Sequence, residues 1–199
     1  INTAQIPEKT NKSPVDIIAE AEDQISGVAQ VELYYRMVGS TNWKQFNDAL
    51  LDEPYEWGFM LSDNEDGGLY ELCTIATDNA GNVESEPSTG EVEFIIDTHI
   101  PYVPDAESEY RFTKNEVPTF TDITFEDDYL LHSVYYRMNF EETNIWTPIT
   151  TLDPDQKSIQ PIWNMTLSQW EVMTEDVSYQ MFFKLEDSLG NVLITTTPV

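Results

Sequence analysis

The sequence of 199 residues has few of the residue types that catalytic and disulfide-bonded proteins depend on. It contains one cysteine, Cys73, so no disulfide can form within the chain. His99 and His132 are the only histidines, too few to build a zinc site of the cysteine and histidine type. The sequence also lacks a glycine-rich phosphate-binding loop and the Gly-x-Ser-x-Gly pattern of hydrolases. We therefore expect the chain not to be an enzyme.

Basic residues are scarce as well. Lys and Arg number 9 against 37 Asp and Glu, which gives a formal net charge of −28. Nucleic-acid binding needs clustered Lys and Arg, so we expect no nucleic-acid partner. No apolar run approaches the roughly 18 residues that cross a bilayer, so we expect no membrane insertion of this segment. At 40% hydrophobic and 12% aromatic residues, the chain is too apolar for a disordered acidic polymer.

The chain contains an internal repeat. The tetrapeptide Tyr-Tyr-Arg-Met occupies 34–37 and again 135–138. A longer pattern starts with Tyr, alternates apolar residues and ends in Asp-x-x-Gly-Asn; it spans 70–82 and again 179–191. Landmarks that recur in the same order at similar spacing indicate a duplicated domain. The sequence therefore contains two tandem copies of one domain.

We predict the two domains to be residues 1–98 and 99–199, each built from short strands. Alternating or β-branched segments predict strands at 15–21, 28–37, 69–77 and 91–96, and at 119–125, 133–140, 178–185 and 192–196. Turn residues separate these segments, and only 167–173 suggests a short helix. About seven short strands in about 100 residues are typical of an antiparallel β-sandwich. The predicted fold class is therefore all-β.

Several segments resemble a known family. The repeated pattern over 70–82 and 179–191 resembles the penultimate strand and following hairpin of fibronectin type III and related immunoglobulin-like domains. Residues 21–35 resemble the second and third strands of bacterial and archaeal surface repeats of that kind. Asp-Thr-x-x-Pro at 97–101 resembles the junction between such repeats. The resemblance implies two tandem antiparallel immunoglobulin-like (fibronectin III-like) β-sandwiches from a cell-surface or adhesin protein.

This architecture places three acid-rich elements at one pole of the second domain: the incoming linker, the loop between its second and third strands, and its last hairpin. Calcium takes six to eight oxygen ligands, mainly carboxylates and carbonyls, and would cancel the repulsion between these carboxylates. We therefore predict an interdomain calcium site with these candidate ligands: Asp97, Glu126, Asp127, Asp128, Asp187 and Asn191. The first domain offers a weaker equivalent set: Glu22, Asp23, Asp78 and Asn82. The alternative is that Asp78 and Asp187 only hydrogen-bond the backbone of their turns.

The tryptophans fall into two groups. Trp43 and Trp146 follow the repeated tetrapeptide in both copies, which predicts a shared packing role. Trp57, Trp163 and Trp170 have no clear repeat equivalents, so we expect them to make surface contacts specific to each copy, with Trp163 and Trp170 as the candidate ligand-binding residues. Arg36 and Arg137 are expected to point outward toward surface carboxylates, where such a pair is worth about 0–1 kcal/mol.

These features predict a non-catalytic structural or adhesive module of a larger extracellular or cell-surface protein. Because the chain begins with Ile1 and not Met, we expect it to be a piece of that protein. It would act as a spacer, with calcium as the expected cofactor that rigidifies the interdomain junction. Its predicted partners are neighbouring immunoglobulin-like domains of the same chain and a cell-surface protein or glycan. The alternative is a carbohydrate- or protein-binding accessory region of a secreted enzyme, which exposed and coplanar Trp163 and Trp170 would favour.

Overall fold

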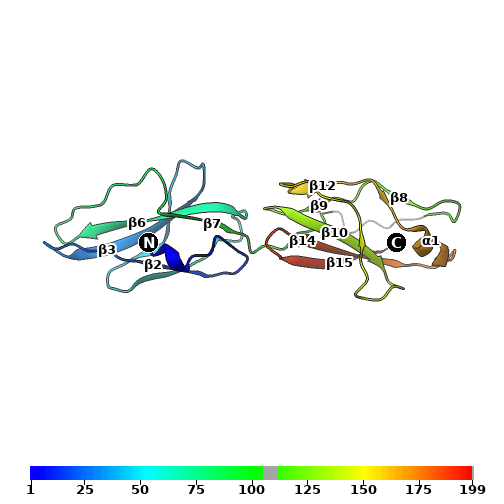
Figure 1. Cartoon of the computed structure of the whole chain (residues 1–199), viewed down its shortest axis with the longest axis horizontal. Helices are drawn as coiled ribbons and strands as arrows, with labels where there is room; N and C mark the ends of the chain where they lie inside the picture. The colour runs from blue at the N-terminus through cyan, green and yellow to red at the C-terminus, as the bar shows by residue number, and fades with distance from the viewer. Residues whose placement is uncertain (105–111, 199) are drawn as a thin grey trace. The chain divides into compact units, whose positions relative to one another are not determined.

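The computed structural model describes residues 1–104 and 112–198 (Figure 1). The chain divides into two compact units, unit 1 (Ile1–Thr98) and unit 2 (His99–Val199). Apart from η1 (Thr3–Gln5) and α1 (Leu167–Val172), every regular element of the described residues is a strand, so the predicted all-β fold class is confirmed. Among the described residues, no helix is long and apolar enough to cross a membrane.

Unit 1 is a sandwich of two layers. One layer is a five-stranded sheet with the order β1-β7-β6-β3-β4, and the other is the antiparallel pair of β2 and β5. Only the β1–β7 pairing is parallel. The elements are η1 (Thr3–Gln5), β1 (Lys9–Thr10), β2 (Val15–Ala19), β3 (Val28–Met37), β4 (Lys44–Leu50), β5 (Tyr55–Phe59), β6 (Gly68–Asp78) and β7 (Val92–Ile96).

The core of unit 1 lies between these layers, because alternate residues of each strand face inward. In β5, for example, Tyr55, Trp57 and Phe59 are buried while the residues between them are exposed. Phe59 lies at the centre, with its ring centroid 5.0 Å from that of Phe46 and 5.9 Å from that of Phe94. Full burial of one such side chain contributes about 1.5–3 kcal/mol, so the aromatic cluster and the buried aliphatic residues around it together stabilise this layer contact.

The opposite face of the five-stranded sheet holds a buried ion pair. Arg36 Nε donates to Glu71 Oε1 at 2.7 Å, and both side chains are about 90% buried or more. The Arg36 guanidinium also lies 4.0 Å from the ring centroid of Trp43, and unit 2 repeats this contact between Arg137 and Trp146 at 5.1 Å. The predicted packing role of the repeated tryptophans is confirmed. Both arginines point away from the core, as predicted, and Arg36 pairs with a carboxylate. The expectation that this pair lies on the surface is wrong, because the Arg36–Glu71 pair is buried and the Trp43 ring covers the guanidinium.

Unit 2 has the same two layers with a more broken second layer. Its main sheet has the order β11-β10-β14-β15, and β8 pairs with β13 and β9 with β12 in the other layer. The elements are β8 (Thr119–Phe120), β9 (Phe125–Glu126), β10 (Leu131–Met138), β11 (Thr147–Pro148), β12 (Ser158–Ile159), β13 (Trp163–Asn164), α1 (Leu167–Val172), β14 (Gln180–Asp187) and β15 (Val192–Pro198).

The single strand predicted over 119–125 is two short strands, β8 and β9, with irregular chain between them. The segment that pairs with these two strands, β12 to β13, explains the interruption. Pro161 lies between β12 and β13, and proline has no N–H to donate to a ladder. The helix predicted at 167–173 is present as α1, with a capping box formed by Thr166 and Gln169 at its start.

The two units pair their repeated strands with registers that differ by two residues. Tyr35 lies opposite Leu72 in unit 1, whereas Tyr136 lies opposite Phe183 in unit 2. The sequence repeat instead aligns Leu72 with Met181. Because side chains alternate with a period of two along a strand, this even shift leaves the same faces directed at the core.

Candidate metal-binding site and acidic cleft

Asp187 organises the turn between β14 and β15. Its Oδ1 accepts hydrogen bonds from the backbone N–H groups of Leu189, Gly190 and Asn191 at 2.8, 2.6 and 2.9 Å. Its Oδ2 accepts from the Asn191 side-chain amide at 2.6 Å. The side chain is buried at 1% exposure. Asp187 therefore has the contacts of a turn residue, and Asn191 fixes the orientation of its carboxylate.

Asp127 lies beside Asp187 and is also buried, at 4% exposure. Carboxylate oxygens of the two residues lie within 4.8 Å of each other. Asp127 Oδ1 accepts the Tyr129 N–H at 2.8 Å, but Oδ2 is buried with no hydrogen-bond partner among the described residues. Burial, together with the negative charges of Asp187 and Asp128, raises the pKa of Asp127 to about 6, against the opposing backbone hydrogen bonds from Tyr129 and Leu130. The pair thus holds negative charge that the described side chains do not neutralise.

The other predicted ligands of unit 2 differ in their surroundings. Asp128 follows Asp127 directly, and its Oδ2 contacts His99 Nδ1. Glu126 instead accepts hydrogen bonds from the hydroxyl groups of Tyr102, at 2.7 Å, and Ser158, at 3.2 Å. Unit 2 therefore brings together Asp127 and Asp187, with Asp128 adjacent, whereas Glu126 is held by other partners.

Asp97 belongs to unit 1, immediately after β7. Its backbone N–H donates to the Thr10 carbonyl at 3.1 Å, and its side chain lies against Gly67. A Cβ on Gly67 would stand 2.6–2.8 Å from three atoms of the Asp97 side chain, closer than real contacts allow. Glycine at position 67 is therefore needed for Asp97 to occupy this place.

The weaker set in unit 1 forms self-contained turns. Asp23 accepts the Ile25 N–H at 2.8 Å and the Ser26 hydroxyl at 2.9 Å. Asp78 accepts the N–H groups of Ala80, at 2.9 Å, and Asn82, at 2.8 Å, and the Asn82 side-chain amide at 2.7 Å. The hydrogen bond from Ile25 lowers the pKa of Asp23, and those from Asn82 lower the pKa of Asp78. Both carboxylates are thus held ionised by donors from their own turns.

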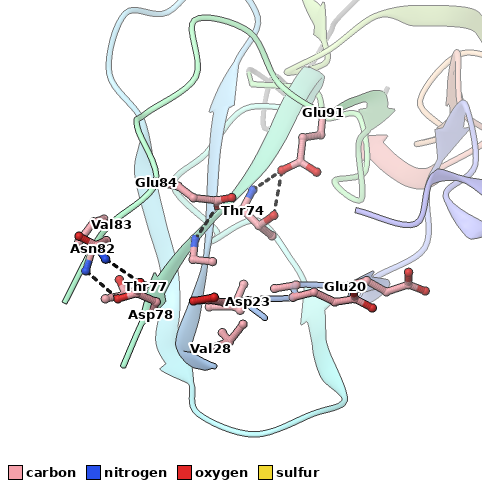
Figure 2. A pocket seen from close by; sticks show the side chains of 14 residues that line it. Glu20, Asp23, Val28, Thr74, Thr77, Asp78, Asn82, Val83, Glu84 and Glu91 are labelled. Carbon is pink, nitrogen blue, oxygen red and sulfur yellow. Dashed lines mark hydrogen bonds between the residues drawn. The ribbon is translucent and has the colours of Figure 1, made fainter. Parts of the chain in front are cut away.

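Asp23, Asp78 and Asn82 do not form a compact metal cluster with Glu22, which is exposed. Within the described parts of the chain, no three acidic residues of unit 1 alone offer ligand atoms within 4.8 Å of one another. They line an open cleft of about 490 Å³ instead, and Figure 2 shows Asp23 and Asp78 on its wall. Six carboxylates line this cleft: Glu20, Glu22, Asp23, Asp78, Glu84 and Glu91.

Trp163 and Trp170 are not on the surface, so their prediction as exposed ligand contacts is wrong. Trp163 is 5% exposed and stacks on Phe120, with the ring centroids 4.4 Å apart; Tyr136 lies 4.6 Å away on the same measure. Trp170 is 8% exposed and packs from α1 into the core, with the Lys114 ammonium 4.6 Å from its ring centroid. Trp163 lies on β13, which pairs with β8 as β5 pairs with β2 in unit 1, where Trp57 is also buried. Trp170 lies on α1, for which unit 1 has no counterpart helix.

Sequence reasoning missed Glu84 and Glu91. Both side chains accept hydrogen bonds from backbone N–H groups of β6, which no linear motif indicates. Their role becomes visible only once the extent of the β6–β7 pairing is known.

Comparisons with known proteins give likeness at the level of structure. No protein-family model matches the sequence, and no curated protein matches it. The chain is similar to fibronectin(III)-like modules of CbhA from Clostridium thermocellum, with 14% identity, a TM-score of 0.30, and 96% of this chain and 85% of that chain covered. It is also similar to the chicken CNTN1 FN1–FN3 domains, with 9% identity, a TM-score of 0.31, and 96% of this chain and 65% of that chain covered.

The strand order within each unit defines its fold. In unit 1, β7-β6-β3-β4 face the β2–β5 pair, and in unit 2, β15-β14-β10-β11 face the pairs that include β8 and β9. These are the same strands in the same order, each sheet antiparallel within this set. The chain therefore consists of two antiparallel β-sandwiches whose strand order is that of an immunoglobulin-like fold.

Proposed function

We propose that this chain is a non-catalytic spacer within a larger extracellular protein, and that calcium stiffens the junction between its two sandwiches. Asp127 and Asp187 would be the central ligands. Asp128 and Asp97, which precedes unit 2 in the chain, would supply further carboxylate oxygens. Calcium prefers such oxygen ligands and tolerates irregular geometry.

The observation that carries this proposal is the buried Oδ2 of Asp127. A buried carboxylate oxygen without a hydrogen-bond donor is unfavourable, and a second buried carboxylate within 4.8 Å increases the cost. A divalent cation converts both unfavourable contributions into attraction. By contrast, the partly exposed Asp23 and Asp78 in unit 1 have donors from their own turns, so they favour the turn role alone.

The accessory-region alternative loses its main support. Exposed tryptophans that could stack on a sugar would have favoured it, but Trp163 and Trp170 are buried in the core of unit 2. We therefore retain the spacer function.

Calorimetry of the chain in EDTA and in millimolar calcium chloride tests the metal. Calcium should raise the Tm of one transition, and Asp187→Asn should remove most of that rise. Asp153→Asn, which removes an exposed carboxylate from the same unit, is the control and should retain it. An unchanged Tm in calcium would overturn the metal site.

Small-angle scattering of the same samples tests the stiffening. Calcium should narrow the distribution of distances between the two units. If calcium raises the Tm without narrowing this distribution, the ion binds but the proposed mechanical role is wrong.

A further inference from the structure

Arg137 is a buried cation for which unit 2 supplies no anion. It lies on β10, on the face of the main sheet opposite the core, and it is 9% exposed. Its Nε is buried without a hydrogen-bond partner, and no described residue forms a hydrogen bond or ion pair with its guanidinium. The ring centroids of Phe182 and Trp146 lie 3.9 and 5.1 Å from the guanidinium carbon. These rings attract the cation but offer no hydrogen-bond acceptor, so the buried Nε–H remains unsatisfied.

The equivalent arginine of unit 1 shows what such a guanidinium binds. Arg36 Nε donates to the Glu71 carboxylate at 2.7 Å, and Arg36 Nη2 donates to the Ser88 carbonyl at 2.7 Å. Beside it, Trp43 Nε1 donates to the Pro87 carbonyl at 3.1 Å. A carboxylate and two backbone carbonyl groups therefore occupy the donors of this arginine and tryptophan in unit 1.

The two-residue register shift removes the carboxylate from unit 2. Glu71 lies opposite Arg36 across β3 and β6, whereas the residue opposite Arg137 across β10 and β14 is Phe182. Alignment of the sequence repeat places Gln180 at the position of Glu71, and this side chain is also uncharged. Neither comparison gives Arg137 a carboxylate equivalent to Glu71.

The segment that covers this face in unit 1 has no described counterpart in unit 2. β6 and β7 are joined by 79–91, which brings the Pro87 and Ser88 carbonyl groups to the tryptophan and the arginine. β14 and β15 are joined by 188–191 alone, and these residues form only a tight turn. Among the described residues, no acceptor bonds the Trp146 indole N–H. Unit 2 thus presents both donors without the segment that occupies them in unit 1.

The surroundings of Arg137 favour an anion although the chain as a whole is acidic. Lys184 lies on the same face, on β14, with its ammonium 5.7 Å from the Tyr135 ring centroid. Glu186 lies 3.7 Å from that ammonium and offsets one of the two positive charges. Exposed Ile194 pairs with Lys184 across β14 and β15, and it extends the face with apolar surface. A cationic and aromatic face in a chain of charge −28 is complementary to an acidic partner.

We propose that this face of unit 2 binds an extended, acidic segment of another polypeptide. A carboxylate of that segment would accept hydrogen bonds from the Arg137 Nη groups, since Nε is enclosed, and a backbone carbonyl group would accept the Trp146 indole N–H. A polypeptide is favoured because unit 1 fills the equivalent donors with a side-chain carboxylate and main-chain carbonyl groups. Arginine suits this role because its donors lie in the guanidinium plane and stay available when rings pack on its faces. The interaction goes beyond the spacer role and does not depend on calcium.

An NMR titration with a peptide that carries both kinds of acceptor tests the proposal. The probe is acetylated, amidated Glu-Ser-Glu-Pro-Ser-Thr, the sequence of 84–89, and its control is Gln-Ser-Gln-Pro-Ser-Thr. About 0.15 M salt screens the repulsion from the acidic chain. The glutamate peptide should shift the Arg137 Nε–H and Trp146 indole N–H signals, and it should bind at least about fivefold more tightly than the glutamine peptide. The Trp43 indole signal should stay in place, because the Pro87 carbonyl already accepts its N–H.

Three variants connect these signals to the site. Arg137→Gln removes the charge and should weaken binding of the glutamate peptide at least about fivefold. Trp146→Phe keeps a ring but loses the N–H donor, and it should weaken binding about threefold or more. Lys157→Gln removes an exposed cation that precedes β12 in the other layer, and it should leave binding unchanged. Because Trp146→Phe retains an aromatic ring for packing, it keeps the test valid even if Arg137→Gln does not fold.

Several outcomes would overturn the proposal. One is the absence of any Trp146 shift at about 10 mM peptide, a concentration that nearly saturates a site with a Kd of about 1 mM. Others are equal shifts of the Trp43 and Trp146 signals, equal binding of the two peptides, or an equal loss in all three variants. Sodium acetate at the same carboxylate concentration should shift the Arg137 signal less than the peptide does. An equal shift would indicate a site for small anions and not for a polypeptide.

Discussion

Replacing Asp127 by Asn should stabilise the calcium-free chain at neutral pH. The folded-state pKa of Asp127 is about 6, against 3.8 for the free side chain. Each pKa unit corresponds to about 1.4 kcal/mol, so ionised Asp127 destabilises the fold by up to about 3 kcal/mol at pH 7. Asn keeps an oxygen for the Tyr129 N–H, and its amide can donate toward the Asp187 carboxylate. The substitution removes the charge while retaining the shape.

The pH dependence of this effect has a definite sign. Because the folded-state pKa is raised, the folded chain binds more protons than the unfolded chain between about pH 4 and 6. The contribution of Asp127 therefore lowers stability as the pH rises through this interval and stays constant above it. Asp127→Asn should lose this slope, so its advantage over the unmodified chain should be absent near pH 4 and complete by about pH 7.

Urea denaturation in EDTA at a series of pH values measures this difference, with Asp153→Asn as the matched loss of an exposed charge. The same Asp127→Asn variant should no longer gain stability from calcium. If it is less stable than the unmodified chain at pH 7 in EDTA, the assignment of an uncompensated buried charge to Asp127 is wrong.

Two further substitutions test unit 1. Gly67→Ala should destabilise the chain by about 1–3 kcal/mol, because its Cβ would overlap the Asp97 side chain; Gly68→Ala, where the nearest atom is a flexible methionine end at 3.4 Å, should cost less, and equal losses in urea denaturation would contradict the clash. Arg36→Ala should cost about 3–5 kcal/mol by leaving the Glu71 carboxylate buried without its partner. A loss below about 1 kcal/mol would place that pair among ordinary surface contacts.

Much of the architecture could be predicted from local patterns. Alternation of apolar side chains located β3, β6, β7, β10 and β14, because a half-buried strand directs every second residue to the core. The repeat identified the two copies because their turns retain Asp-x-x-Gly-Asn.

Features that depend on contacts between distant segments could not be predicted in this way. Composition does not distinguish the buried Trp163 from an exposed sugar-stacking tryptophan, since the difference lies in Phe120 and Tyr136 packing against it. The two-residue shift in register between β10 and β14 does not change which side chains face the core. The hydrophobic pattern of the sequence therefore cannot reveal the shift.

The candidate site was predictable as a set of acids but not in its division of roles. Asp78 and Asp187 occupy equivalent positions in the repeat, yet Asp78 is partly exposed and Asp187 is buried beside a second carboxylate. The sequence around each turn is similar, so burial alone separates them. Glu126 was predicted from its neighbours Asp127 and Asp128, but strand alternation turns it toward Tyr102 and Ser158.

The burial of Cys73 limits the reactivity of its thiol. Its side chain is 0% exposed on the face of β6 opposite the core, and burial raises the pKa of the thiol to about 12. The reactive thiolate is therefore nearly absent while unit 1 is folded. We therefore expect the thiol to react only when unit 1 opens. Its labelling rate thus reports mechanical or thermal opening of one sandwich without any engineered probe.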